Sequence, residues 1–133
     1  MAEYFSENEL GSASKHSNLA PSMSALIIGN HVKEGLDLAK EYKLNNAIMD
    51  FIQEHHGTSL IAYFYQKALE KAEEGENPEE ESFRYPGPRP QTKESAIILL
   101  ADAVEASSRS LDDPTPGSIR NLVKKIINNL LDL

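Results

Sequence analysis

Apolar residues recur at helical spacing in five segments of the chain. Their approximate ranges are 21–42, 46–56, 58–73, 92–111 and 116–133. A recurrence every three to four residues places apolar side chains on one face of an α-helix. The sequence shows no internal repeat and no run of alternating strands. The pattern therefore predicts an all-α fold, a helical bundle of about five helices.

Residues that begin or end helices agree with these ranges. Pro21 stands in a first-turn position that tolerates proline, and Gly57 is a plausible C-terminal stop for the second helix. Thr58 or Ser59 can cap the third helix, which is expected to run to about residue 73. Thr92 or Ser95 can cap the fourth, and the Asp112–Gly117 segment separates it from the fifth.

The remaining segments are irregular. Residues 1–20 are polar and are expected to form an irregular or displaced segment, and residues 74–91 to form one long loop. Pro86, Pro88 and Pro90 exclude a helix from the end of that loop, and loops of this length are often functional. The fifth helix reaches Leu133 without a cap and the chain opens on a polar segment. We therefore expect a sequence cut at both ends.

Composition places the chain among single soluble domains. Its 133 residues are 40% apolar and 26% charged, which is ordinary for a globular protein. Cysteine is absent, so a metal site would use His, Asp or Glu. The apolar runs are too short to span a membrane and no secretory signal is evident. We expect a cytoplasmic location and no membrane contact by this chain.

The net charge of −8 is concentrated in one stretch. Residues 70–81 hold seven Glu and one Lys, so the rest of the chain carries only −2. Such runs usually keep a loop solvated. No stripe of Lys or Arg appears before Lys124 and Lys125, so we expect no binding of DNA or RNA.

Three histidines point toward apolar helix faces. His31 follows Ile27 and Ile28, while His55 and His56 follow Ile52 by three and four residues. A buried imidazole needs a partner at each nitrogen, and a metal ion supplies one such partner. Satisfied core histidines are the alternative. Adjacent histidines lie about 100° apart on a helix, so His55 and His56 cannot share one packing role. His16, in the polar opening segment, is expected to be a surface residue.

Asp102 interrupts the apolar run 96–101 of the fourth helix. Carboxylates are seldom buried without a partner, and carboxylate with imidazole suits iron, manganese or zinc. An ion pair between helices, or a cap on a neighbouring helix, is the alternative role for Asp102.

The proline-rich loop carries several candidate substrate contacts. Guanidinium groups match phosphate oxygens, which makes a set of residues in and beyond the loop candidates for substrate binding: Arg84, Tyr85, Arg89, Lys93 and Arg109. Alternatively, the tyrosine and prolines only pin a surface loop against the helices.

Four segments together resemble a known family. His31-Val32-Lys33-Glu34-Gly35, Glu54-His55-His56-Gly57-Thr58, the Phe83–Pro88 loop and Leu100–Ala106 are similar to the cytoplasmic HD domain of the PgpH-type seven-transmembrane-receptor HD family, over about residues 4–133. The resemblance implies an all-α HD domain that binds two metal ions, iron or manganese. A metal-bound hydroxide would open cyclic di-AMP to pApA. It also implies that His31, His55, His56 and Asp102 are metal ligands.

One feature of the family is missing. The defining His-Asp pair occurs nowhere, because the four histidines are followed by Ser17, Val32, His56 and Gly57. We therefore expect residues 1–133 to be the C-terminal portion of a single HD phosphohydrolase domain. Alone, it would bind metal weakly or not at all and would be inactive. The parent protein would be membrane-anchored with this domain in the cytoplasm.

Three alternatives follow from the missing pair. The chain belongs to a degenerate relative, or it acts as a non-catalytic all-α signalling or nucleotide-sensing module of a membrane receptor, or it hydrolyses another phosphate ester. A domain without its first helices also exposes apolar faces, so self-association is expected.

Overall fold

The computed structural model describes residues 19–131, and within that range the chain is helical. The helices are α1 (Pro21–Glu41), α2 (Asn46–Glu54), α3 (Ala62–Lys71), the 3-10 helix η3 (Glu80–Phe83), α4 (Lys93–Ser108) and α5 (Pro116–Leu131). The described residues contain no strand, only an isolated antiparallel bridge between Leu60 and Arg84. None of these helices has the length and apolar character needed to cross a membrane. The all-α prediction with five α-helices is confirmed.

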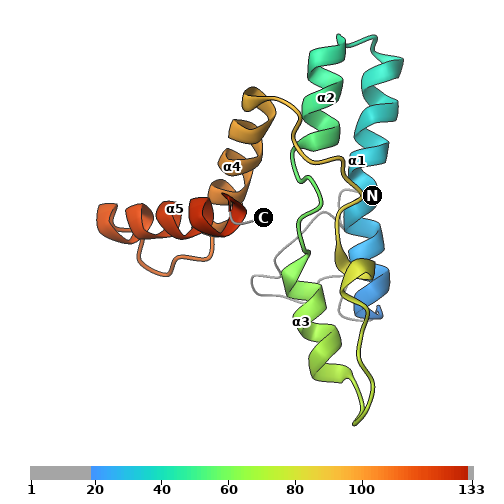
Figure 1. Cartoon of the computed structure of the whole chain (residues 1–133), viewed down its shortest axis with the longest axis vertical. Coiled ribbons are helices and arrows are strands. Elements are labelled where there is room, and N and C mark those ends of the chain that lie inside the picture. Colours follow the sequence, from blue (N-terminus) through green and yellow to red (C-terminus); the bar gives the residue numbers. More distant parts are fainter. Residues whose placement is uncertain (1–18, 132–133) are drawn as a thin grey trace.

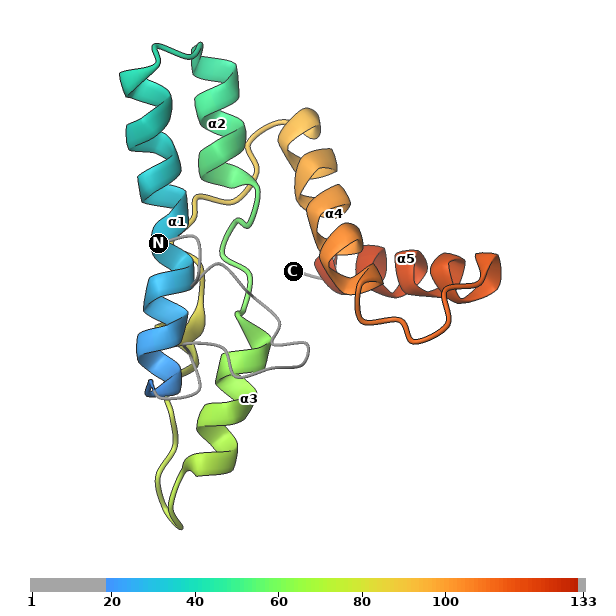
Figure 2. The same ribbon diagram turned by 180° about the vertical axis from the view of Figure 1, so that it is seen from behind.

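The long helix α1 organises the fold. The helices α2 and α3 follow one another along its side, and the acidic loop returns beside α3 (Figure 1). The helix α4 packs against α2, and α5 lies across α4, so this pair projects from one side of the molecule (Figure 2). The end of α2 is therefore positioned between α1 and α4.

Local capping explains several helix boundaries. Pro21 occupies the first turn of α1. The Asn45 side chain accepts a hydrogen bond of 3.0 Å from Ile48 N and starts α2. At α4 the Thr92 hydroxyl accepts from Ser95 N at 3.1 Å, which satisfies one of the amides left unpaired at a helix start. Thr92 is thus the cap, while Ser95 is buried inside the first turn.

The core lies between α1, α3 and the segment after η3. Its buried members are Ala25, Ile28, Val32, Ile61, Phe64, Phe83 and Tyr85. Not every residue of the predicted apolar stripes is inside: Leu26 is 66% exposed and Ile97 is 64% exposed. Both lie on helix faces that no described element covers.

The start of the third helix was predicted wrongly. Residues 59–61 are extended because they pair with residues 83–85: Ile61 N donates to Phe83 O at 2.7 Å and Tyr85 N donates to Ser59 O at 3.0 Å. These hydrogen bonds hold the backbone out of a helix. Thr58 and Ser59 therefore cap nothing, and α3 begins at Ala62 without a side-chain cap. The paired segments 59–61 and 83–85 are called the clamp below.

The segment 74–91 was predicted to be one long loop and is more ordered than that. It contains η3, and its residues 83–85 form half of the clamp. At its end, Gln91 N donates to the buried Glu54 carboxylate at 3.0 Å. The prolines exclude an α-helix as expected, but long-range hydrogen bonds, which have no local sequence signal, fix the course of the loop. The predicted irregular segment 1–20 lies almost entirely outside the described residues.

Gly57 forms the turn that follows α2, and we expect its replacement to be destabilising. Its φ of +54° is unfavourable for a residue with a Cβ, and an added Cβ would lie 3.3 Å from Leu99 Cδ1. Gly57→Ala should lower the free energy of unfolding by about 1–2 kcal/mol. Gly29→Ala is the matched control, because Gly29 lies within α1 and a Cβ added there would meet nothing within 4 Å. This substitution should raise the free energy of unfolding by up to about 1 kcal/mol. Urea denaturation measures the free energy of unfolding of both variants. Equal changes in the two would contradict the positive φ assigned to Gly57.

Candidate metal centre

Three histidine side chains converge at the junction of α1 and α2. His31 comes from the middle of α1, and His55 and His56 follow the last residue of α2. His31 Nε2 lies 3.3 Å from His55 Nε2 and 3.1 Å from His56 Nε2. One ring nitrogen from each residue lies within 4.8 Å of the others, a grouping that suits a metal ion. We call these residues the three-histidine group.

A close approach of α1 and α2 makes this convergence possible. Gly35 sits one turn beyond His31, and a Cβ added there would lie only 3.0 Å from Ile52 Cγ2. The absence of a side chain lets α2 lie close against α1 at this level. His31 therefore faces the end of α2, where His55 and His56 stand.

Backbone carbonyls fix the tautomers of two imidazoles. His31 Nδ1 lies 2.5 Å from Ile28 O, and His55 Nδ1 lies 2.7 Å from Ile52 O. A carbonyl oxygen only accepts hydrogen bonds, so each neutral ring carries its proton on Nδ1 and a lone pair on Nε2. Two such lone pairs 3.3 Å apart repel one another unless a positive charge lies nearby. The arrangement therefore favours a cation.

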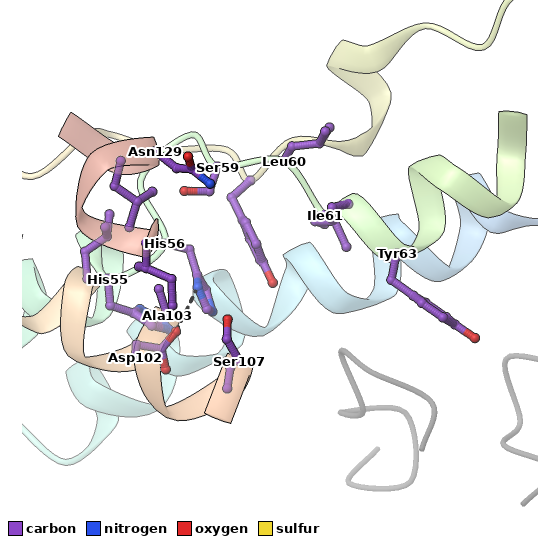
Figure 3. Close-up of a pocket in the computed structure, with 16 residues that line it drawn as sticks. His55, His56, Ser59, Leu60, Ile61, Tyr63, Asp102, Ala103, Ser107 and Asn129 are labelled. Atoms are coloured by element: carbon purple, nitrogen blue, oxygen red, sulfur yellow. Dashed lines mark ion pairs between the residues drawn. The ribbon is translucent and has the colours of Figure 1, made fainter. Parts of the chain in front are cut away.

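Asp102 holds the third imidazole. Its Oδ2 lies 3.3 Å from His56 Nδ1, and this ion pair is the dashed line in Figure 3. A carboxylate on Nδ1 directs the Nε2 lone pair of His56 toward His31, in the manner of the carboxylates that orient metal-binding histidines.

The setting of Asp102 differs from its predicted one. Its side chain is 39% exposed, less buried than the apolar run around it indicated, because α4 stands away from the α1–α3 core. Its contact with His56 joins α4 to the turn that follows α2. Asp102 lies outside the three-histidine group, and its role as a direct metal ligand stays a prediction.

The electrostatic surroundings favour the neutral form of His55. Burial lowers the pKa of His55 below its ordinary value of 6.5, and the neighbouring imidazoles of His56 and His31 lower it further, against the opposing effects of Ile52 O and Asp102. Only a neutral imidazole offers a lone pair to a metal ion. The site thus favours the protonation state that metal binding requires.

A cavity of about 310 Å³ lies beside the histidines. His55, His56, Asp102 and Ser107 lie around it in Figure 3, together with Asn129 of α5. Its other walls are largely apolar and come from the clamp, α4 and α5. The cavity has room for part of a small phosphate ester next to the imidazoles.

The predicted substrate-binding residues lie in different places. Arg84 donates to Thr58 O at 3.0 Å and pairs with Glu80, and Arg89 Nε donates to Thr58 Oγ1 at 3.3 Å. Both line a second cavity of about 250 Å³. Tyr85 is buried beside the three-histidine group.

The other two cations stand apart from the first cavity. Lys93 is the first residue of α4 and is exposed, and Arg109 pairs with Glu105 on the solvent side of α4. Neither residue lines the cavity beside the histidines. Their roles in substrate binding stay predictions.

Sequence reasoning missed two supporting features. Glu54 is 5% exposed although it is charged, and it anchors the end of the long loop through Gln91 N. The carbonyls of Ile28 and Ile52 act as orienting groups for the histidines three residues later. Every residue has a backbone carbonyl, so no sequence signal marks the second feature.

Comparison with known sequences identifies relatives. The profile described as HD domain matches residues 10–107. The chain is 45% identical over 129 residues to the cyclic-di-AMP phosphodiesterase PgpH of Bacillus subtilis, a match that covers 97% of this chain and 18% of that protein. The chain therefore spans less than a fifth of the length of this relative.

Solved structures share the fold. The crystal structure of the Listeria monocytogenes phosphodiesterase PgpH HD domain superposes with a TM-score of 0.83 at 42% identity, covering 98% of this chain and 60% of that one. The same domain in complex with cyclic-di-AMP gives a TM-score of 0.82 at 42% identity, covering 90% of this chain and 55% of that one. This chain is thus similar, in its helical fold and in 42% of the aligned residues, to a domain solved in complex with cyclic-di-AMP.

Proposed function

The chain belongs to the HD domain family, and from that membership we propose that it forms part of a metal-dependent phosphodiesterase domain that hydrolyses cyclic di-AMP to pApA. The convergence of three imidazole nitrogens within 4.8 Å carries the proposal. The 45% identity to a cyclic-di-AMP phosphodiesterase and the similarity to a domain solved with that nucleotide support the choice of substrate. The parent would be an integral membrane protein with this domain in the cytoplasm.

The donor set fits divalent iron or manganese. Imidazole suits iron, and carboxylate oxygen suits manganese. His31, His55, His56 and Asp102 would hold the ions, two in the parent domain. When bound, such ions activate water and neutralise charge on the phosphoryl oxygens.

The residues of this chain would have separate roles in that reaction. The carbonyls of Ile28 and Ile52 hold the imidazoles of His31 and His55 with Nε2 directed inward. Leu60 and Leu99 contribute to the apolar walls of the adjoining cavity. Low local polarity strengthens the attraction between bound cations and the anionic substrate.

The His-Asp pair is expected from residues outside this sequence. The sequence contains no His-Asp dipeptide, and the chain spans 60% of the related crystallised domain. The chain alone therefore supplies an incomplete ligand set, and we expect it to be inactive.

The test compares this chain with the parent domain extended upstream. The extended domain should contain a His-Asp pair, bind iron or manganese on elemental analysis and convert cyclic di-AMP to pApA, whereas the present chain should show no turnover. Cyclic di-GMP and (p)ppGpp serve as competing substrates. An extended domain that lacks the pair and the metal would contradict the enzyme assignment and favour a non-catalytic nucleotide-sensing role. Preference for another nucleotide would correct the substrate alone.

A further inference from the structure

The aromatic ring of Tyr85 lies flat against one imidazole of the three-histidine group. The rings of Tyr85 and His56 are stacked, with centroids 4.1 Å apart and planes inclined by 14°. The same tyrosine meets the His31 ring edge-on at 6.0 Å. Tyr85 is only 6% exposed, so its ring is part of the wall behind the histidines.

His56 is held differently from the other two histidines. His31 and His55 each place Nδ1 on a carbonyl of their own helix, three residues earlier. His56 Nδ1 instead meets the carboxylate of Asp102, which belongs to α4 and is 39% exposed. Pairs that involve a partly exposed carboxylate are weak. Contacts with the faces of the His56 ring therefore contribute to its orientation.

The backbone fixes Tyr85 where it can provide that contact. Tyr85 N donates to Ser59 O at 3.0 Å, and two residues earlier Phe83 O accepts from Ile61 N at 2.7 Å. Phe83, 3% exposed, anchors this side of the clamp in the core. The His55 ring also lies against His56, with centroids 3.9 Å apart and an inclination of 40°. The imidazole of His56 thus contacts two neighbouring rings.

We propose that Tyr85 is a positioning residue that holds the His56 imidazole in the orientation needed for metal binding. The inference rests on the proposed function, because it assigns His56 to the metal centre. It gives the clamp a role beyond folding, because the clamp places the aromatic ring of Tyr85 beside His56. The flat face of the Tyr85 ring makes the contact with His56. A phenylalanine at this position should therefore keep the effect, and a leucine should not.

The experiment compares Tyr85→Phe and Tyr85→Leu in the present chain. Calorimetric titration with Co²⁺ should give an affinity near that of the unmodified protein for Tyr85→Phe and a loss of about tenfold or more for Tyr85→Leu, the scale found for outer partners of metal ligands. In the metal-free protein, proton NMR of the His56 ring should show the upfield displacement caused by a stacked aromatic ring. Tyr85→Leu should remove this displacement and Tyr85→Phe should keep it.

Phe64→Leu provides the control for packing. It alters a buried ring of the core that lies outside the clamp and contacts Tyr63, and it should reduce stability without changing the Co²⁺ affinity. A parallel loss of affinity in Phe64→Leu would show a general effect of destabilisation and overturn the proposal. Unchanged His56 signals in Tyr85→Leu would also overturn it. If the unmodified chain binds no Co²⁺, because its ligand set is incomplete, the same titrations are made in the domain extended upstream. The NMR comparison in the present chain still decides whether Tyr85 orients His56.

Discussion

Replacing His31 with alanine is expected to lower the affinity of the chain for Co²⁺ by about 100-fold or more. His31 Nε2 is the nitrogen that both other imidazoles approach, at 3.3 and 3.1 Å. Loss of an outer partner already costs 10–100-fold in metal affinity, so loss of a direct ligand should cost at least the upper value. Co²⁺ is a suitable probe because it binds nitrogen ligands more tightly than iron or manganese of the same charge.

Calorimetric titration measures the affinity, and two controls make it specific. His16→Ala removes a histidine predicted to be a surface residue and should leave the affinity unchanged. Thermal unfolding without metal should show that His31→Ala remains folded, while Co²⁺ should raise the melting temperature of the unmodified chain only. Equal Co²⁺ affinities for His31→Ala and the unmodified chain would rule out the three-histidine group as the binding site.

Replacing Phe64 with alanine is expected to cost about 3–5 kcal/mol of stability. The Phe64 side chain is 1% exposed and belongs to the core between α1 and α3. Truncation of a buried phenylalanine loses its transfer free energy and leaves a cavity. Because domains are stable by only about 5–15 kcal/mol, the variant should be partly unfolded near physiological temperature.

Urea denaturation followed by circular dichroism measures this effect. Leu69→Ala is the matched control on the same helix, since Leu69 is 37% exposed and its truncation should change stability by only about 0.5 kcal/mol. Similar losses for the two variants would mean that α3 does not pack as described. Reduced Co²⁺ binding by Phe64→Ala is expected only under conditions in which the variant unfolds.

Helix positions followed from local sequence, whereas the grouping of the histidines as metal ligands was implied by the family resemblance. The apolar periodicity of α1 placed Ile28, His31 and Val32 on one side of a helix, and capping by Thr92 marked the start of α4. Such features depend on residues within one or two turns of each other. The gathering of His31 with His55 and His56 needed only that α1 and α2 lie antiparallel, which their short connection favours.

Features set by distant contacts could not be predicted in this way. The extended backbone at 59–61 exists because Phe83 and Tyr85 pair with it, although Thr58 and Ser59 have good capping chemistry. The exposure of Asp102 depends on where α4 stands relative to the core. The stacking of Tyr85 on His56 joins residues far apart in the chain and has no signature in helical periodicity.

The placement of the three histidines on a single helical hairpin has a consequence for how the site assembles. His31 and His55 are separated by 24 residues, so bringing them together closes a short segment at low entropic cost. Such local contacts form readily during folding. Asp102 and Tyr85, which contact His56, lie beyond the acidic segment of the chain. The nitrogen ligands of the centre are thus local in sequence, and more distant parts of the domain supply the groups that orient them.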